Sequence, residues 1–206
     1  MKYQELRSKL GGHVVFSLSD IRKIDPRFYR VQLDDWQTAG SIKKLRRGHY
    51  YFSDTLLDES TLSLIANRLY APSYVSLESA LSRYGLIPEG VYSITSASTR
   101  KTAVFSTPIG EFSYHTVSPA LFFGYQLESS HAQQYKIAEI EKAVLDYLYL
   151  NPTIAQEEDF HEWRFNSAEF IARADRAKLL RYAKAFRRRG FGQKLEHLLG
   201  LIDRTK

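Results

Sequence analysis

The chain of 206 residues contains no cysteine and only one methionine. The absence of cysteine excludes a disulfide framework, a cysteine-ligated zinc site and a thiol nucleophile. No run of about 18 apolar residues occurs, and the opening MKYQELRSKLGG lacks the continuous apolar segment of a secretory signal. We therefore expect a soluble cytoplasmic protein without a membrane partner.

Sequence motifs of the common enzyme classes are also missing. There is no GxGxxG, phosphate loop, GxSxG or HExxH, and no lysine follows a carboxylate at the spacing typical of metal-dependent nucleases. Glu139 and Glu141 are close in sequence, but on a helix they would lie about 200° apart and would not converge on one metal. We therefore expect a protein without enzymatic activity, without a cofactor and without a metal site.

Apolar residues and charge, by contrast, are plentiful. Hydrophobic residues make up 44% of the chain, enough for a genuine core in one large or two small domains. The net charge of +6 is unevenly distributed: residues 1–54 carry +5, residues 55–159 carry −6 and residues 160–206 carry +7. Basic ends around an acidic middle favour a polyanionic partner, although a basic end could equally bind an acidic protein.

Residues 1–54 show the element order of a winged helix-turn-helix. Asp25-Pro26 begins the third helix, and Gly40 ends it, after which apolar residues alternate as in a hairpin. The predicted elements are a helix over residues 2–10, a strand over 13–16, a short helix from 20 capped by Ser19, a helix over 26–39, and two strands around Arg46-Arg47-Gly48. In such a unit the helix after the turn lies in the major groove.

Four cations crowd the predicted hairpin, namely Lys43, Lys44, Arg46 and Arg47. They would supply sequence-independent attraction to phosphates. Two alternatives remain open, because Lys and Arg also protect an exposed edge strand from pairing, and a winged helix can bind proteins. Asp34 and Asp35 on the third helix oppose close approach to DNA.

Residues 55–206 are predicted to form an α+β domain. Helices are expected over 60–70 and 77–84, strands between 91 and 127, and a helix over 137–150 on which Lys142 and Asp146 form a surface ion pair. A long helix, capped by Asn166 or Ser167, is expected to run to about Phe186, with Ile171 and Leu179 packed inward, before a last helix over 191–202.

The long C-terminal helix carries a possible second basic surface. Its members are Arg173, Arg176, Arg181, Lys184, Arg187, Arg188 and Arg189. Cations near a helix C-terminus interact favourably with its dipole, which explains part of this charge. The rest could pair within the molecule, extend the DNA-contacting surface or meet an acidic partner.

Several segments taken together resemble the AbiEi family. They are SIKKLRRGHYYF, IANRLYAPSYVSLESALSRYGLIPE, TRKTAVFSTPIGEFSYH, LFFGY and IAEIEKAVLDYLYL, and the resemblance extends from about residue 5 to residue 190. The resemblance implies an antitoxin of a type IV toxin-antitoxin system, a predicted transcriptional regulator of viral defence. Such a protein represses its own operon by binding double-stranded promoter DNA, and it counteracts a nucleotidyltransferase-like toxin.

The resemblance also assigns the DNA-binding role to particular residues. It places this role on the helix from Arg27 to Ala39 and on Lys43, Lys44, Arg46 and Arg47. Because Asp34 and Asp35 depart from the basic helix of many members, Arg27, Tyr29, Arg30 and Gln32 are the better candidates for base contacts. A stand-alone regulator without a toxin, and an enzymatic C-terminal domain acting as a nuclease or reversing the toxin's modification, remain alternatives.

Overall fold

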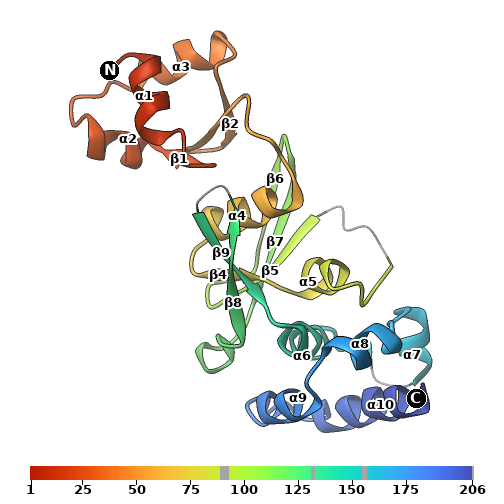
Figure 1. Cartoon of the computed structure of the whole chain (residues 1–206). Helices are drawn as coiled ribbons and strands as arrows, with labels where there is room; N and C mark the ends of the chain where they lie inside the picture. Colours follow the sequence, from red (N-terminus) through yellow and green to blue (C-terminus); the bar gives the residue numbers. More distant parts are fainter. Residues whose placement is uncertain (89–92, 131–132, 155–156, 206) are drawn as a thin grey trace.

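The computed structural model describes residues 1–88, 93–130, 133–154 and 157–205. Figure 1 shows three parts along one long axis: an N-terminal unit, a larger mixed sheet with its covering helices, and a group of C-terminal helices. The predicted α+β class is confirmed. Residues 91 and 92, where a strand was expected to begin, lie outside the described residues.

The N-terminal unit contains three helices and three strands. They are α1 (Tyr3–Leu10), β1 (Phe16–Ser17), α2 (Leu18–Ile24), α3 (Val31–Thr38), β2 (Ile42–Arg46) and β3 (His49–Phe52). The strands form an antiparallel sheet in the order β1-β3-β2. Helical spacing and strand alternation bring one apolar set together beneath the sheet. This core consists of Leu6, Leu10, Phe16, Ile21, Phe28, Leu33, Ile42, Tyr50 and Phe52.

The predicted cap of α2 is wrong by two residues. Ser17, not Ser19, is the N-cap: its hydroxyl accepts from the Asp20 amide at 3.2 Å, and the Asp20 carboxylate accepts from the Ser17 amide at 3.0 Å. This reciprocal capping box satisfies two unpaired amides at once, which a serine inside the helix could not do.

A mixed six-stranded sheet forms the centre of the molecule. Its strands are β4 (Ser73–Val75), β5 (Ser93–Ser98), β6 (Ala103–Thr107), β7 (Gly110–Thr116), β8 (Tyr125–Ser130) and β9 (Gln133–Ala138), in the order β6-β7-β5-β4-β9-β8. The sequence prediction missed β9 and began a helix at Ile137. Tyr135 and Ile137 are buried while Lys136 between them is not, so this segment has the period of a strand.

Helices cover both faces of this sheet. Tyr114 on β7 and Tyr74 on β4 pair with the adjacent β5 residues Ser96 and Ala97, so their side chains point to opposite faces. Tyr114 donates to the carbonyl of Ala66 in α4 (Glu59–Leu69), whereas Tyr74 contacts α6 (Ile140–Leu150) on the other side. A further helix, α5 (Leu77–Arg83), packs between β5 and α6.

The C-terminal helices are α7 (Glu157–Glu162), α8 (Ser167–Arg173), α9 (Arg176–Ala183) and α10 (Phe191–Arg204). The single helix predicted from Ser167 to Phe186 is therefore wrong. Asp175 interrupts it, because its carboxylate caps the amide of Lys178 at 3.0 Å while its own amide donates to Glu141 at 2.7 Å.

An ion pair expected on the surface lies inside the protein. Lys142 and Asp146, one helical turn apart on α6, are both fully buried and in contact. Asp146 also accepts hydrogen bonds from Tyr74 at 2.8 Å and from Ser76 at 2.9 Å, and Lys142 donates to the Tyr74 oxygen at 2.7 Å. These four side chains join α6 to β4 and to the start of α5. The sequence prediction failed because an i,i+4 spacing does not say which face of the helix is covered.

Aromatic rings enclose the ammonium group of Lys142. It lies 5.2 Å from the ring centroid of Tyr74, 5.3 Å from that of Phe123 and 5.2 Å from that of Phe186. Gly124 has φ +69°, and a Cβ there would come within 3.2 Å of the Lys142 side chain. Burial lowers the pKa of Lys142 and raises that of Asp146. Each charge is therefore stabilised by its partner, because buried side chains are not solvated by water.

We predict that Lys142→Met will lower the free energy of unfolding by about 3–5 kcal/mol, because it leaves the Asp146 carboxylate buried without a counter-charge. The double substitution Lys142→Met with Asp146→Leu should recover much of this loss, since it removes both charges. Urea unfolding followed by circular dichroism measures both effects.

The matched control for this prediction is Lys9→Met. Lys9 pairs with Glu5 at the same i,i+4 spacing, at 2.9 Å, but in solvent. Surface pairs of this kind contribute little. An equal effect of the Lys9 and Lys142 substitutions would contradict the importance that we give to the buried pair.

Candidate nucleic-acid interface

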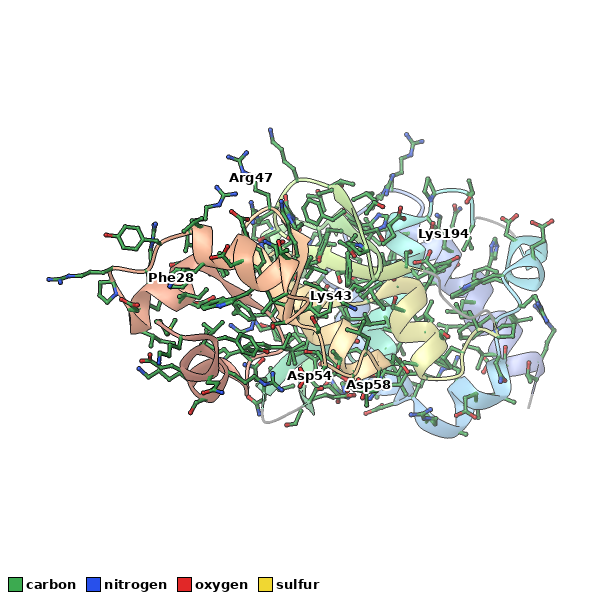
Figure 2. All side chains as sticks on the ribbon, turned by 90° about the horizontal axis from the view of Figure 1, so that it is seen from above. Phe28, Lys43, Arg47, Asp54, Asp58 and Lys194 are labelled. Atoms are coloured by element: carbon green, nitrogen blue, oxygen red, sulfur yellow. The ribbon has the colours of Figure 1, made fainter. Side chains whose placement is uncertain are left out.

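Three of the four predicted hairpin cations are open to solvent. Lys43 and Lys44 are both exposed on β2, although neighbouring strand residues normally alternate, and Arg47 is exposed in the turn to β3. The register of the β2–β3 pair shifts between Lys44 and Arg46. The irregularity lies in an edge strand beside the buried Leu45, and Lys43, Lys44 and Arg47 are all exposed around it. In Figure 2 Arg47 lies towards one long side of the molecule, and Asp54 and Asp58 lie towards the opposite side.

The fourth cation, Arg46, faces the rest of the protein. Its guanidinium carbon lies 3.7 Å from the ring centroid of Phe105 on β6, and the residue is only partly exposed. The neighbouring Leu45 and Tyr51 belong to the core of the larger sheet. Arg46 therefore attaches the hairpin to the central part of the molecule, and the prediction that it contacts phosphate does not fit this position.

The segment before α3 is a turn and not the start of a helix. Asp25 accepts two main-chain bonds, from the Arg27 amide to its carboxylate at 3.1 Å and from the Phe28 amide to its carbonyl at 3.0 Å. Phe28 is buried 5.5 Å from Trp36, so the chain folds inward before the helix begins at Val31. The predicted helix over 26–39 is thus too long by five residues at its start.

Two of the four predicted base-contacting residues project freely from this turn, and a third sits at the helix start. Arg27 is exposed, Tyr29 is 74% exposed, and Arg30 is exposed at the N-cap position of α3. The fourth, Gln32, is partly buried, and its amide donates to the Met1 carbonyl at 3.4 Å. Gln32 therefore supports the N-terminus of the chain, and its predicted contact with a base does not fit this position.

The predicted C-terminal basic surface divides into residues held by hydrogen bonds or ion pairs and residues that are exposed. Arg173 binds Glu169 at 3.2 Å, Arg176 binds Asp203, and Arg188 donates to the Tyr149 carbonyl at 2.8 Å. The other predicted members are exposed, namely Arg181, Lys184, Arg187 and Arg189. Ile171, predicted to face inward, is 37% exposed. The break between α8 and α9 rotates these side chains off the single stripe that a continuous helix would give.

Glu139 and Glu141 meet on one cation, contrary to the angle expected for helical neighbours. Lys178 of α9 lies 3.0 Å from Glu139 and 3.4 Å from Glu141. Glu139 precedes the first helical residue of α6, so the helical angle does not apply to it. A cavity of about 410 Å³ lies at this point, and it is also lined by Tyr84, Gln126, Ile140 and Arg173. Lys178 pairs with both glutamates and so holds α9 against the start of α6, whereas Arg173 pairs with Glu169 outside the lining.

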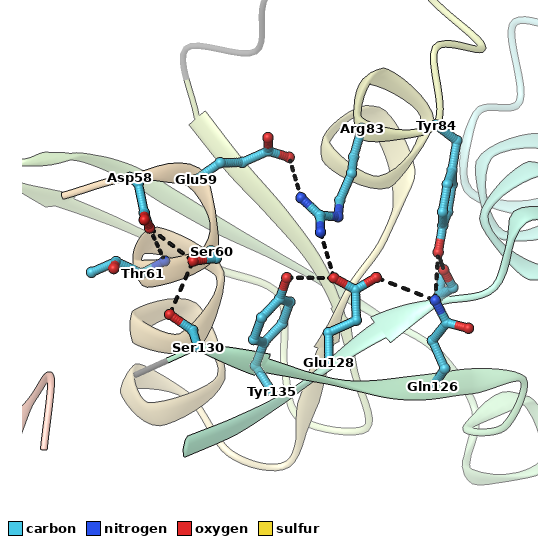
Figure 3. A network of polar contacts seen from close by, with 11 residues as sticks. Asp58, Glu59, Ser60, Thr61, Arg83, Tyr84, Gln126, Glu128, Ser130 and Tyr135 are labelled. Carbon is cyan, nitrogen blue, oxygen red and sulfur yellow. Dashed lines mark hydrogen bonds and ion pairs between the residues drawn. The ribbon is translucent and has the colours of Figure 1, made fainter. Parts of the chain in front are cut away.

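A second polar network, which no local pattern in the sequence indicates, lies beside β8 (Figure 3). Glu128 of β8 accepts from Tyr135 at 2.7 Å and from Gln126 at 3.2 Å, and it pairs with Arg83 of α5. Arg83 also reaches Glu59 at the start of α4 at 3.5 Å. The network joins α4, α5 and the β8–β9 hairpin. Burial alone would raise the pKa of Glu128, but the bonds from Tyr135 and Arg83 outweigh burial and lower it.

No protein-family model matches the chain, and no curated protein sequence matches it either. Among the described residues, no helix is long and apolar enough to cross a membrane, and no three histidine or carboxylate side chains are grouped to hold a metal ion. The exposed cations of the N-terminal unit form the candidate nucleic-acid interface.

We predict that Glu128→Gln will lower the free energy of unfolding at pH 7 by about 1 kcal/mol after solvent screening. The folded-state pKa of Glu128 lies below its ordinary value of 4.5, so the carboxylate contributes its stability above that pH. The contribution is lost as the pH falls through the lowered pKa. The difference between the two proteins should therefore shrink below about pH 4.5.

Urea titrations at a series of pH values measure this difference. Glu111→Gln, which removes an exposed carboxylate on β7, is the matched control and should show no comparable dependence. A difference between Glu128→Gln and the unaltered protein that stays constant down to pH 3 would contradict the assignment.

Proposed function

We propose that the chain binds double-stranded DNA through its N-terminal unit, acting as a winged helix-turn-helix. The observation that carries the proposal is the exposure of three cations, Lys43, Lys44 and Arg47, on a hairpin that follows three helices and closes a three-stranded sheet. In helix-turn-helix proteins, a second helix enters the major groove and neighbouring cations contact the backbone. Phosphate contacts fix the position of the protein on the duplex.

The start of α3 supplies groups suited to reading bases. Arg27 and Arg30 carry planar guanidinium groups that can form two hydrogen bonds with guanine. Tyr29 and Val31, which is 62% exposed, add apolar surface for a thymine methyl group. Asp34 and Asp35 face solvent further along α3 and repel phosphate. The N-terminal end of α3 and the preceding turn would therefore enter the groove, with the acidic end held away from the backbone.

We further propose that the protein is an autorepressor and antitoxin without enzymatic activity of its own, which counteracts a nucleotidyltransferase-like toxin. This part rests on the resemblance of its sequence segments to the AbiEi family. Residues 55–206 would carry the antitoxin activity. The paired charges of Glu139, Glu141 and Lys178 and of Glu128 and Arg83 support a structural role for the conspicuous polar clusters of this region.

We predict that Arg47→Ala will weaken binding to the chain's own promoter and to random duplex DNA by a similar factor. It should also lower the slope of log affinity against log salt by about 1, because one phosphate contact is lost. Fluorescence anisotropy at several salt concentrations measures both quantities.

Two variants make the Arg47 experiment specific. Arg68→Ala removes an equal charge from an exposed site on α4 and should leave the slope unchanged. Arg46→Ala should also change the slope little, because its guanidinium lies on Phe105. If all three variants lower the slope equally, general charge and not the hairpin explains binding, and the interface is assigned incorrectly.

We predict that replacing Arg27, Arg30 and Arg47 together by Ala will abolish repression of the chain's own promoter and leave antitoxin activity intact. The three side chains are exposed and belong to neither hydrophobic core cluster, so their removal should leave the fold of residues 55–206 intact. A promoter reporter measures repression, and co-expression with the neighbouring toxin gene measures growth. The absence of a neighbouring nucleotidyltransferase gene would remove the antitoxin proposal and leave a stand-alone regulator.

A further inference from the structure

A small cavity rich in positive charge lies between the end of α6 and the start of α10. Its volume is about 150 Å³, and it is lined by Leu148, Tyr149, Pro152, Arg188, Arg189, Phe191 and Lys194. Three of these seven residues are cations, and none of the seven is a carboxylate. Figure 2 places Lys194 towards the opposite end of the molecule from Phe28 and so from the turn before α3.

Two of the three cations have a structural reason for their position. Arg188 donates to the Tyr149 carbonyl at 2.8 Å, and Lys194 donates to the Asn151 carbonyl at 2.7 Å. These carbonyls end α6, which has no basic residue of its own in its last turn. Cations from the following helices therefore satisfy the unpaired carbonyls and the negative end of the α6 dipole.

The end of α6 does not explain the third cation or the remaining donors. Arg189 is exposed and forms no hydrogen bond or ion pair with the described part of the chain. A guanidinium has five N–H donors and an ammonium has three, so Arg188 and Lys194 also keep donors beyond those bonds. Burial lowers the pKa of Lys194, and the charge of Arg188 lowers it further, partly offset by Asp159. Like charges held this close favour an added anion.

We propose that this cavity binds a phosphate group. Two guanidinium groups can each bind two oxygens of one phosphate, and the ammonium group adds a point charge. The cavity is far larger than one water molecule needs. Because Arg189 is exposed, the rest of a phosphorylated molecule can extend from the cavity into solvent. The proposal goes beyond DNA recognition by the N-terminal unit because it uses none of the same residues.

Titration of the full-length protein with inorganic phosphate, followed by isothermal calorimetry, tests the proposal. At constant ionic strength, phosphate should give a binding isotherm. Chloride at the same ionic strength is the control and should give none. Arg189→Gln should weaken binding about tenfold or more, because it removes a charged donor. Arg189 is exposed, so this variant should keep the thermal unfolding temperature of the unaltered protein.

Arg187→Gln is the matched control. It lies two residues away in the same basic run and is exposed, but it does not line the cavity. It should leave phosphate binding unchanged. Equal losses in the Arg187 and Arg189 variants, or phosphate binding no stronger than chloride binding, would overturn the proposal, since either result means diffuse charge and not a site.

Two further probes distinguish the sources of the phosphate. A short single-stranded oligonucleotide is compared with and without a 5′-phosphate, and ribose 5-phosphate is compared with ribose. A gain from the oligonucleotide's 5′-phosphate that depends on Arg189 supports a nucleic-acid end. A gain confined to ribose 5-phosphate supports a small phosphorylated metabolite. Absence of any Arg189-dependent gain from a phosphate group in both pairs overturns the site.

Discussion

The buried pair of Lys142 and Asp146 is the interaction on which the larger part of the molecule depends. Removing two charges from water carries a large free-energy cost, which is offset only when each charge has its partners in place. Here the partners come from three elements: Asp146 and Lys142 from α6, Tyr74 from β4, and Ser76 from the start of α5. The arrangement therefore fixes how α6 crosses the sheet. The positions of Glu139 and Glu141, and through them of α9, follow from that crossing.

Contacts between the N-terminal unit and the central sheet are of a different kind. The hairpin of the N-terminal unit meets the sheet through Leu45, Tyr51 and the stacking of Arg46 on Phe105. This contact uses one hairpin cation as a structural group and leaves three in solvent. The two uses follow from position: a guanidinium over an aromatic ring is partly desolvated, whereas Lys43, Lys44 and Arg47 keep their full interaction with water and with ions. A basic cluster that reads as uniform in the sequence thus serves two purposes.

The cations behind the C-terminal charge of +7 also divide into structural and exposed groups. Arg173 and Arg176 pair with carboxylates, and Arg188 and Lys194 satisfy the end of α6. What is left is a small number of exposed arginines and lysines, of which Arg189 alone lines the cavity beside α10. The net charge of a segment is therefore a poor guide to its partner, because part of the charge is used within the fold. The residues that remain unpaired are the informative ones.

The sequence by itself determined the α+β class, the order of elements in the N-terminal unit and the β2–β3 hairpin, because these depend on local periodicity and turn residues. It did not determine β9, the break before Asp175 or the turn from Asp25 to Arg30, where hydrogen bonds to distant or neighbouring groups decide between local alternatives. Only the tertiary structure decided that Lys142 and Asp146 are buried, that Gln32 donates to the Met1 carbonyl and that Arg46 lies on Phe105. A side chain's partners across 30 or more residues leave no trace in local spacing, so the sequence gives the chemistry available and the fold decides which of it faces solvent.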